Sequence, residues 1–212
     1  MAHGCVIFWF PSMVRVHPMT NSNFFRPVAL EHASRLVNHG PTVLVTSSDG
    51  TRRNVMAAAW SMPVEFTPPR IAIVIDKRTY TRELIAASGA FAICIPGAEL
   101  VDLTYAVGSA SGRDLDKFAR YNITATPGPE LGMPLLETGC AAWLECRLIP
   151  ESHTEDAYDT CFGEVVAAAA DERVFVKGRW SFTGENTALH TIHHLGGGNF
   201  VCASNAIQAH PL

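Results

Sequence analysis

The first regular pattern in the chain is that of a short amphipathic helix. Leu30, Ala33 and Val37 recur on one stripe at helical spacing. Pro27 stands where a first-turn proline is favourable, and Gly40-Pro41 ends the pattern. The sequence therefore predicts a helix between Pro27 and Gly40.

A β-hairpin is predicted next. Residues 42–46 are β-branched and apolar, residues 48–50 read Ser-Asp-Gly, which is a turn sequence, and residues 53–61 have the length of a returning strand. Pro68-Pro69 then interrupts the pattern, so a new element is expected after it.

A strand, a helix and a second strand are expected in close succession. Residues 71–75 form a continuous apolar run, which is typical of a strand covered on both faces. The polar segment 76–82 leads into good helix formers at 83–88, and Gly89 ends that helix before the apolar run 90–95. Thr79 or Thr81 is expected to cap the start of the helix.

The remaining pattern settles the expected fold class. Another helix is predicted at 98–107, closed by Gly108, and a Pro/Gly-rich connection follows at 127–134. Further strands are predicted at 142–149, 162–169, 174–182 and 199–203. Strands outnumber helices, and the helices are inserted between them. The predicted class is α+β with a mainly antiparallel barrel rather than the regular alternation of a doubly wound sheet.

Composition narrows the kind of ligand. Hydrophobic residues make up 48% of the chain and charged residues 17%, which is typical of a globular protein with some apolar surface for a partner subunit. The formal net charge of -4 supplies no field for holding a nucleic acid or an anionic membrane. A small-molecule ligand is therefore expected.

The beginning of the chain and its cysteines bear on processing and compartment. Residues 1–20 are expected to be a disordered extension or, with Met13 and Met19 as alternative starts, a misassigned beginning, and 21–212 a single domain. The apolar run 5–10 ends at Pro11, too short for a membrane span. Six cysteines are scattered without a C-x-x-C pair, which suits a reducing cytoplasm.

Several familiar motifs are missing from the sequence. Neither a G-x-G-x-x-G after a strand nor a P-loop is present, so any bound phosphate has to be held in another way. There is also no G-x-S-x-G elbow. His190, His193 and His194 lie close together, but no second cluster of ligand residues accompanies them, so no metal site is predicted.

Two segments point to ligand binding, each with a plainer interpretation beside it. Residues 76–82 crowd three cations and three hydroxyls at a helix amino end, where free N–H groups attract anions, yet an ordinary capped helix with a solvated basic face fits equally well. The alanines at 57–59 make a poor strand but would let a flat ligand lie against the main chain. A tightly packed strand explains them too.

A series of short motifs follows one another along the chain: R-N-V-M-A-A-A-W-S (53–61), F-T-P-P-R (66–70), K-R-T-Y-T-R-E-L-I (77–85), F-A-I-C-I-P (91–96), S-G-R-D-L-D-K-F (111–118), L-E-C-R (144–147) and H-H-L-G-G-G-N-F (193–200). In their order and spacing they resemble the flavin reductase family with an FMN-binding split β-barrel, the group that includes flavoredoxin. The resemblance runs from about Pro27 to Phe200.

The resemblance implies where FMN is held. The edge of its ring system would lie against the main chain of one strand, at Asn54, Met56, Ala57, Ala58 and Ala59. Trp60 would support that wall. The ribityl phosphate would be surrounded by Lys77, Tyr80, Thr81 and Arg82.

Two further segments match family positions with roles left open. Ser111, Gly112, Arg113 and Lys117 match a segment near the flavin or the dimer interface, although Arg113 and Asp114 could equally form a surface ion pair. His193 and His194 match the closing segment, where a histidine, here His194 as the candidate catalytic residue, approaches the ring or the nicotinamide. A structural histidine beside a glycine turn is the alternative. Cys94 stands where many members carry asparagine, which puts a ligand contact by that side chain in doubt.

The activity implied by the resemblance is transfer of reducing equivalents from NADH or NADPH through FMN to a second acceptor, such as flavin supplied to a monooxygenase or another redox partner. An electron carrier of the flavoredoxin type, with little nicotinamide activity of its own, is the first alternative. A pyridoxamine-phosphate-oxidase-like FMN enzyme and a barrel that has lost its flavin and serves only in assembly are the others. The resemblance also implies a homodimer with the flavin near the subunit boundary.

Overall fold

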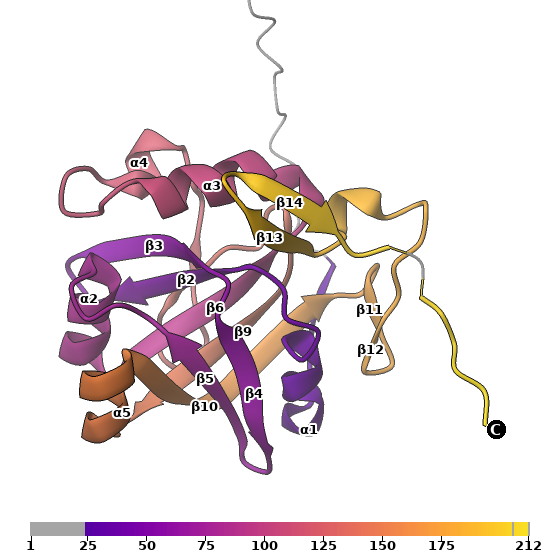
Figure 1. Ribbon diagram of the computed structural model, residues 1–212, viewed down its shortest axis with the longest axis horizontal. Coiled ribbons are helices and arrows are strands. Elements are labelled where there is room, and N and C mark those ends of the chain that lie inside the picture. The colour runs from indigo at the N-terminus through magenta and orange to yellow at the C-terminus, as the bar shows by residue number, and fades with distance from the viewer. Residues whose placement is uncertain (1–23, 205, 212) are drawn as a thin grey trace, which may run out of the picture.

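The computed structural model describes residues 24–204 and 206–211, and it is built around one antiparallel sheet. The strand order is β3-β2-β6-β9-β10-β5-β4, with β1 paired to β10 (Figure 1). These strands are β1 (Phe25–Pro27), β2 (Val43–Ser48), β3 (Arg53–Ala58), β4 (Ser61–Phe66), β5 (Pro69–Val74), β6 (Ala90–Pro96), β9 (Cys140–Ile149) and β10 (Thr160–Asp171). The predicted α+β, mainly antiparallel class with inserted helices is confirmed. The predicted extension at 1–20 lies outside the described residues.

Helices and short hairpins connect and cover these strands. The helices are α1 (Leu30–Ala33), α2 (Tyr80–Ser88), α3 (Val101–Ser109), α4 (Lys117–Arg120) and α5 (Ser152–Tyr158), with 3₁₀ turns η2 (Ser34–Leu36), η3 (Ala98–Leu100) and η4 (Thr187–Leu189). The two-stranded ribbons pair β7 (Thr126–Pro127) with β8 (Pro134–Leu135), β11 (Phe175–Val176) with β12 (Arg179–Trp180), and β13 (Ile192–Gly196) with β14 (Asn199–Cys202). None of the helices among the described residues is long and apolar enough to cross a membrane.

The central strands are buried because the sheet is covered on both faces. All seven residues of β6 are buried, as its unbroken apolar run predicts. One face contributes Ile93, Leu144 and Cys146 to a core shared with β5 and α2, and the other contributes Cys94 and Trp143 to a core under α3 and α4. This packing fixes the position of β3, the strand at one end of the sheet.

Several predicted boundaries are wrong. Residues 53–61 do not form one strand: β3 ends at Ala58 and a new edge strand, β4, begins at Ser61. Residues 174–182 form the β11–β12 hairpin, with Lys177 and Gly178 turning at positive φ, instead of a single strand. In the first case the apolar residues continue through the turn at Ala59 and Trp60, so no turn sequence marks it. In the second case Lys177-Gly178 does mark the turn, and the prediction of a single strand passed over that signal.

The helix predictions also need correction. Pro27 belongs to β1, and the first helix begins at Leu30 and tightens into η2 after one turn. Gly108 lies inside α3 and does not close it. The helix α5 was not predicted, because 152–158 is largely polar and carries no apolar stripe.

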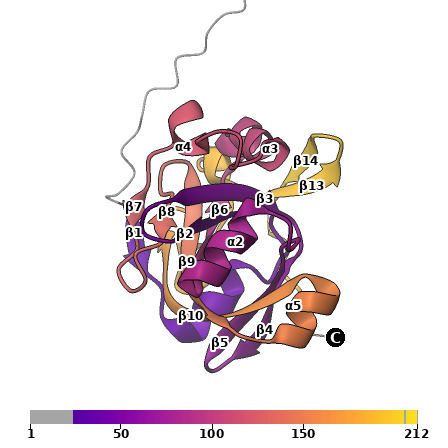
Figure 2. The same ribbon diagram turned by 90° about the vertical axis from the view of Figure 1, so that its left-hand side faces the viewer.

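The elements around β3 define where a ligand can approach. In both views, α3 and the β13–β14 hairpin lie along the same side of β3, while α5 lies beside the β4–β5 end (Figures 1 and 2). β3 pairs with β2 on one edge, and β2 continues to β6. The outer edge of β3 therefore faces α3 and α4 rather than another strand of the described sheet.

Candidate functional site

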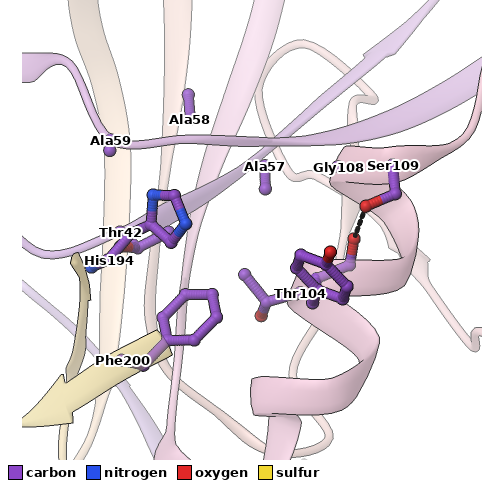
Figure 3. Close-up of a pocket in the computed structure, with 10 residues that line it drawn as sticks. Thr42, Ala57, Ala58, Ala59, Thr104, Gly108, Ser109, His194 and Phe200 are labelled. Atoms are coloured by element: carbon purple, nitrogen blue, oxygen red, sulfur yellow. Dashed lines mark hydrogen bonds between the residues drawn. The ribbon is translucent and has the colours of Figure 1, made fainter. Parts of the chain in front are cut away.

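A cleft of about 210 Å³ opens between β3, α3 and the β13–β14 hairpin. We call it the alanine cleft (Figure 3). Its lining residues are Thr42, Ala57, Ala58, Ala59, Thr104, Tyr105, Gly108, Ser109, His194 and Phe200. The methyl group of Ala57 points into the space bounded by Thr104, His194 and Phe200, whereas that of Ala58 points away (Figure 3). A planar group can therefore lie against the β3 main chain, where small side chains leave room for it.

Small residues let α3 lie close to β3. A Cβ placed on Gly108 would stand 3.2 Å from the Cβ of Ala57, so the two elements are in direct contact there. One turn earlier on α3, the Thr104 side chain is fully buried, and its hydroxyl has no hydrogen-bond partner among the residues that the structure describes. Because an unpaired buried hydroxyl is costly and Thr104 lines the cleft, this oxygen is a candidate partner for a ligand group there.

The β13–β14 hairpin forms the opposite wall. His194 and Phe200 pair across the two strands, and their ring centroids are 5.0 Å apart. Thr42, just before β2, anchors the hairpin: its N–H donates to the Ile192 carbonyl at 2.8 Å, and its Oγ1 accepts from the His194 N–H at 2.9 Å. The imidazole of His194 is thereby placed at the open side of the cleft.

A second cleft of about 380 Å³ lies further along β3. We call it the arginine cleft. Its lining residues are Asn54, Met56, Arg78, Thr79, Tyr80, Thr81, Val107, Gly108, Ser109, Ala110, Ser111, Gly112, Arg113 and Lys117. Three of these are cations and none is acidic, so the cleft suits an anionic group.

The start of α2 forms one side of the arginine cleft. Thr79, one of the two threonines predicted as the cap, is the N-cap, and its Oγ1 accepts from the Arg82 N–H at 3.2 Å. The first N–H groups of the helix lie here, and they carry the positive end of its dipole. Asn54 on β3 donates from its Nδ2 to the Thr81 Oγ1 at 2.8 Å, and both side chains are buried. This bond fixes the helix start against β3.

The segment 110–116 forms the facing side. A Cβ on Gly112 would lie 2.2 Å from the Asn54 Oδ1 and 2.8 Å from the Tyr80 ring, so only glycine permits this approach. Arg113 bonds Glu83 on α2 at 3.0 Å, which ties the segment to the helix. Gly112 and the Arg113–Glu83 ion pair therefore hold the 110–116 segment close to β3 and α2.

Lys117, at the start of α4, lies at the base of the same cleft. Its ammonium donates to the Val55 carbonyl at 2.9 Å and to the Val107 carbonyl at 2.7 Å, which joins β3 to α3. Burial lowers the pKa of this amine to about 8. The amine is therefore mostly protonated at pH 7 and loses its proton in mildly alkaline solution.

The two clefts adjoin, because Gly108 and Ser109 line both of them. An apolar slot beside the alanines therefore continues into a slot lined by cations and hydroxyls. The larger cleft alone falls within the range of about 300–1,000 Å³ that is usual for small-molecule sites.

Most of the residues predicted from the sequence line these clefts. Ala57, Ala58, Ala59 and His194 line the alanine cleft. Asn54, Met56, Tyr80, Thr81, Ser111, Gly112, Arg113 and Lys117 line the arginine cleft.

Lys77 and Arg82 lie elsewhere, toward α5. The Lys77 ammonium donates to the Asp156 carbonyl and lies 3.7 Å from the Asp159 carboxylate. The Arg82 guanidinium is largely buried, pairs with Glu155 at 2.5 Å and contacts the Cys161 thiol. Neither side chain lines either cleft.

Two further predicted positions, Trp60 and His193, also fall outside the clefts, and so does Cys94, whose contact with a ligand the sequence left in doubt. Trp60 is 74% exposed and does not back the alanine strand. His193 does not line the alanine cleft. Its Nδ1 bonds the Gly40 carbonyl at 2.9 Å, and its ring packs against that of His39. Cys94 is fully buried, accepts a bond from the Leu136 N–H, and burial raises its pKa to about 12.

Sequence reasoning missed the contribution of α3 and the far end of the last hairpin. Thr42, Thr104, Tyr105, Gly108, Ser109 and Phe200 line the alanine cleft but were not predicted as site residues. The spacing of Thr104 and Gly108, one helical turn apart, was an available signal, since two small residues on one face allow close packing. Their partner strand could not be named without the fold.

The comparisons with known proteins identify the family. The family model described as flavin reductase like domain matches residues 35–183. The uncharacterized protein YddH of Escherichia coli (strain K12) is 59% identical over 187 residues, covering 87% of this chain and 98% of that protein.

Two solved structures extend the similarity to the fold. The FMN-binding domain of a flavin reductases-like enzyme from Shewanella baltica OS155 superposes with a TM-score of 0.84 at 38% identity, covering 88% of this chain and 97% of that chain. Flavoredoxin of Desulfovibrio vulgaris (Miyazaki F) gives a TM-score of 0.69 at 28% identity, covering 80% and 90%. The chain belongs to the flavin reductase-like family, and its fold is that of the FMN-binding members.

Proposed function

We propose that the two clefts together bind one molecule of FMN, with the ring system in the alanine cleft and the ribityl phosphate in the arginine cleft. The observation that carries this proposal is the continuity of an apolar slot with a cationic one through Gly108 and Ser109. The Shewanella baltica relative is described as FMN-binding, which supports the same ligand here.

The residues present fit both ends of such a ligand. At the ring end, Thr104 offers a buried hydroxyl that lacks a partner, and the outer edge of β3 offers main-chain groups. At the phosphate end, Arg78, Arg113 and Lys117 offer positive charge, and the start of α2 offers N–H groups. No carboxylate among the lining residues would repel a dianion.

FMN, when bound, supplies the redox chemistry, since its ring can accept a hydride and release electrons singly or in pairs. The chain's own task is to hold the donor against the open side of the alanine cleft. We assign His194 and Phe200 to that role because they stand at this opening, and their hairpin is fixed by Thr42.

We propose that the electron donor is NADH or NADPH and that the acceptor is free flavin, for a monooxygenase, or another redox protein. The similarity to flavoredoxin favours one alternative, an electron carrier with little nicotinamide activity. Anaerobic stopped-flow reduction of the FMN-loaded protein separates them. Reduction at a saturable rate by NADH or NADPH supports the first function, whereas reduction only by a protein donor supports the second.

Gly112→Ala is expected to weaken FMN binding at least tenfold. The added methyl group would overlap the Asn54 amide and the Tyr80 ring, so the 110–116 segment must move outward and widen the arginine cleft. Riboflavin, which lacks the phosphate, should be affected less. Fluorescence titration of the flavin-free variant with each ligand measures both effects.

Gly184→Ala is the matched control, because a Cβ at Gly184 meets nothing within 4 Å and the backbone there is not left-handed. It should bind FMN like the unmodified protein. Equal FMN affinity in the Gly112 and Gly184 variants would show that the phosphate does not lie in the arginine cleft.

We also propose that the protein is a homodimer through β4. This edge strand and the residue before it expose a run of apolar side chains, at Trp60, Met62, Val64 and Phe66. Exposed apolar edges of this kind mark interaction surfaces, because left open they promote aggregation. Trp60 directly follows Ala59, so the run begins at the rim of the alanine cleft.

Met62→Glu is expected to shift the protein from dimer to monomer. Met62 is 59% exposed in the middle of the run, so a carboxylate there would be buried without a partner in the dimer. Tyr158→Glu on α5, at a residue that is 64% exposed, is the control. Sedimentation velocity over a range of concentrations gives the result, and an unchanged dimer in the Met62 variant would place the interface elsewhere.

The thiols of the described residues support a proposal about the compartment. Cys94, Cys140, Cys146, Cys161 and Cys202 are all free. We therefore propose a cytoplasmic location, where thiols stay reduced.

A further inference from the structure

Lys117 is a buried cation with no carboxylate partner among the described residues. The residue is 3% exposed. Its hydrogen-bond partners among the described residues are two main-chain carbonyls, of Val55 and Val107, and no ion pair joins it to a carboxylate within that part of the chain. Buried ammonium groups are normally paired, because neutral acceptors offset only part of the lost hydration. An ammonium has three N–H donors, so one remains for a ligand.

The charged groups around Lys117 leave this imbalance in place. Across the arginine cleft stand Arg78, just before α2, Tyr80 at the start of α2, and Arg113 from the 110–116 segment. The two arginines have carboxylates of their own: Arg78 pairs with Asp76 at 2.7 Å and Arg113 with Glu83 at 3.0 Å.

The neighbours on β3 and on α4 itself do not supply the missing charge either. Arg53 on β3 lies over the Phe118 ring, 4.2 Å from its centroid, and adds to the positive potential. The Asp116 carboxylate accepts from the N–H groups of Phe118 and Ala119, so it is occupied in capping α4. An anion in the cleft is therefore the counter-charge that this site lacks.

We propose that binding of a phosphate-bearing flavin in the arginine cleft is coupled to uptake of one proton by Lys117. In alkaline solution the free protein holds a neutral amine at this position. When the phosphate dianion enters, the amine takes a proton from the solvent and becomes the ammonium that pairs with it. No bond other than this N–H forms. The inference rests on the proposed FMN site and adds a proton to its binding equilibrium.

The coupling has a defined direction. Burial lowers the pKa of Lys117 to about 8 in the free protein, and a bound dianion raises it again. Affinity is therefore highest well below pH 8, where the free amine is protonated, and falls as the pH rises through 8. If only the protonated form binds, FMN affinity falls about tenfold between pH 7 and pH 9. Riboflavin affinity should stay nearly constant over the same range.

Calorimetric titration of flavin-free protein with FMN at pH 8.5, in two buffers of different ionisation enthalpy, measures the proton directly. We expect uptake of roughly 0.8 proton for each FMN bound, which is the fraction of a group of pKa about 8 that is neutral at this pH. A phosphate monoester has its second pKa near 6, so it is already a dianion and contributes no proton. Riboflavin serves as the control for protons exchanged by the ring.

Two variants extend the test. Lys117→Arg keeps the charge permanently, so FMN should bind without proton uptake and with little dependence on pH. Lys117→Met removes the charge, so FMN affinity at pH 7 should fall at least tenfold and become independent of pH. If either variant fails to fold, the measurement on the unmodified protein still decides.

The two possible failures are distinguishable. FMN binding at pH 8.5 without proton uptake, or with the same uptake in the Lys117→Arg variant, overturns this inference and leaves the FMN site standing. Absence of FMN binding at every pH overturns the site and this inference together.

Discussion

Ala57→Leu is expected to weaken FMN and riboflavin binding alike by at least ~100-fold, equivalent to ~2.8 kcal/mol at about 1.4 kcal/mol for each factor of ten. The methyl group of Ala57 points into the alanine cleft, between Thr104 and the hairpin residues His194 and Phe200 (Figure 3). A leucine there fills the space that a planar ring would occupy. The expected loss is shared by both ligands because it acts on the ring and not on the phosphate.

Ala57→Ser is the matched control for this prediction. Serine is close to alanine in size, so the cleft stays open and both flavins should bind within about threefold of their normal affinity. Circular dichroism of each variant verifies that the sheet is formed before titration. A folded leucine variant that still binds flavin normally would show that the ring does not lie against β3.

Arg82→Met is expected to lower the free energy of unfolding by about 3 kcal/mol and leave FMN affinity within about twofold. Arg82 is the largely buried partner of Glu155 and also contacts the Cys161 thiol, so its removal leaves a carboxylate without its cation. The side chain faces α5 and lines neither cleft. Urea unfolding of the flavin-free protein gives the stability, and a separate FMN titration gives the affinity.

Lys77→Met makes a useful comparison, because Lys77 belongs to the same motif and its side chain is half exposed. Its ion pair with Asp159 spans 3.7 Å, and exposed pairs of this kind contribute about 0–1 kcal/mol. We therefore expect a small change in stability and no change in FMN binding. A tenfold loss of FMN affinity in either variant would show that the substituted residue contributes to the phosphate site.

The contrast between these residues shows what local sequence can and cannot predict. Both ends of α2 could be predicted: Thr79 caps its start, and Gly89, in the left-handed conformation, ends it. The direction of each basic side chain was not, because Glu155 and Asp159, which attract Arg82 and Lys77, lie more than seventy residues away in sequence. They belong to α5 and its end, in a polar segment that gave no helical signal.

The alanine cleft shows the same division. The three alanines indicated a flat approach to a strand, and the structure places them along a cleft. Their opposite walls come from α3 and from the β13–β14 hairpin, whose position depends on the long-range bonds of Thr42. Trp60 was expected to back the cleft, but the chain turns after Ala58 and leaves it exposed on the way to β4. Tertiary packing decided each of these points, and the residue pattern alone could not.

Titration of the flavin-free protein with FMN and with riboflavin at pH 7, followed by visible absorbance and flavin fluorescence, tests the proposed site most directly. We predict one FMN bound for each chain, with riboflavin at least tenfold weaker because it lacks the phosphate that the cations of the arginine cleft, Arg78, Arg113 and Lys117, would attract. Failure to bind FMN, or equal affinity for the two flavins, would contradict the assignment of the paired clefts.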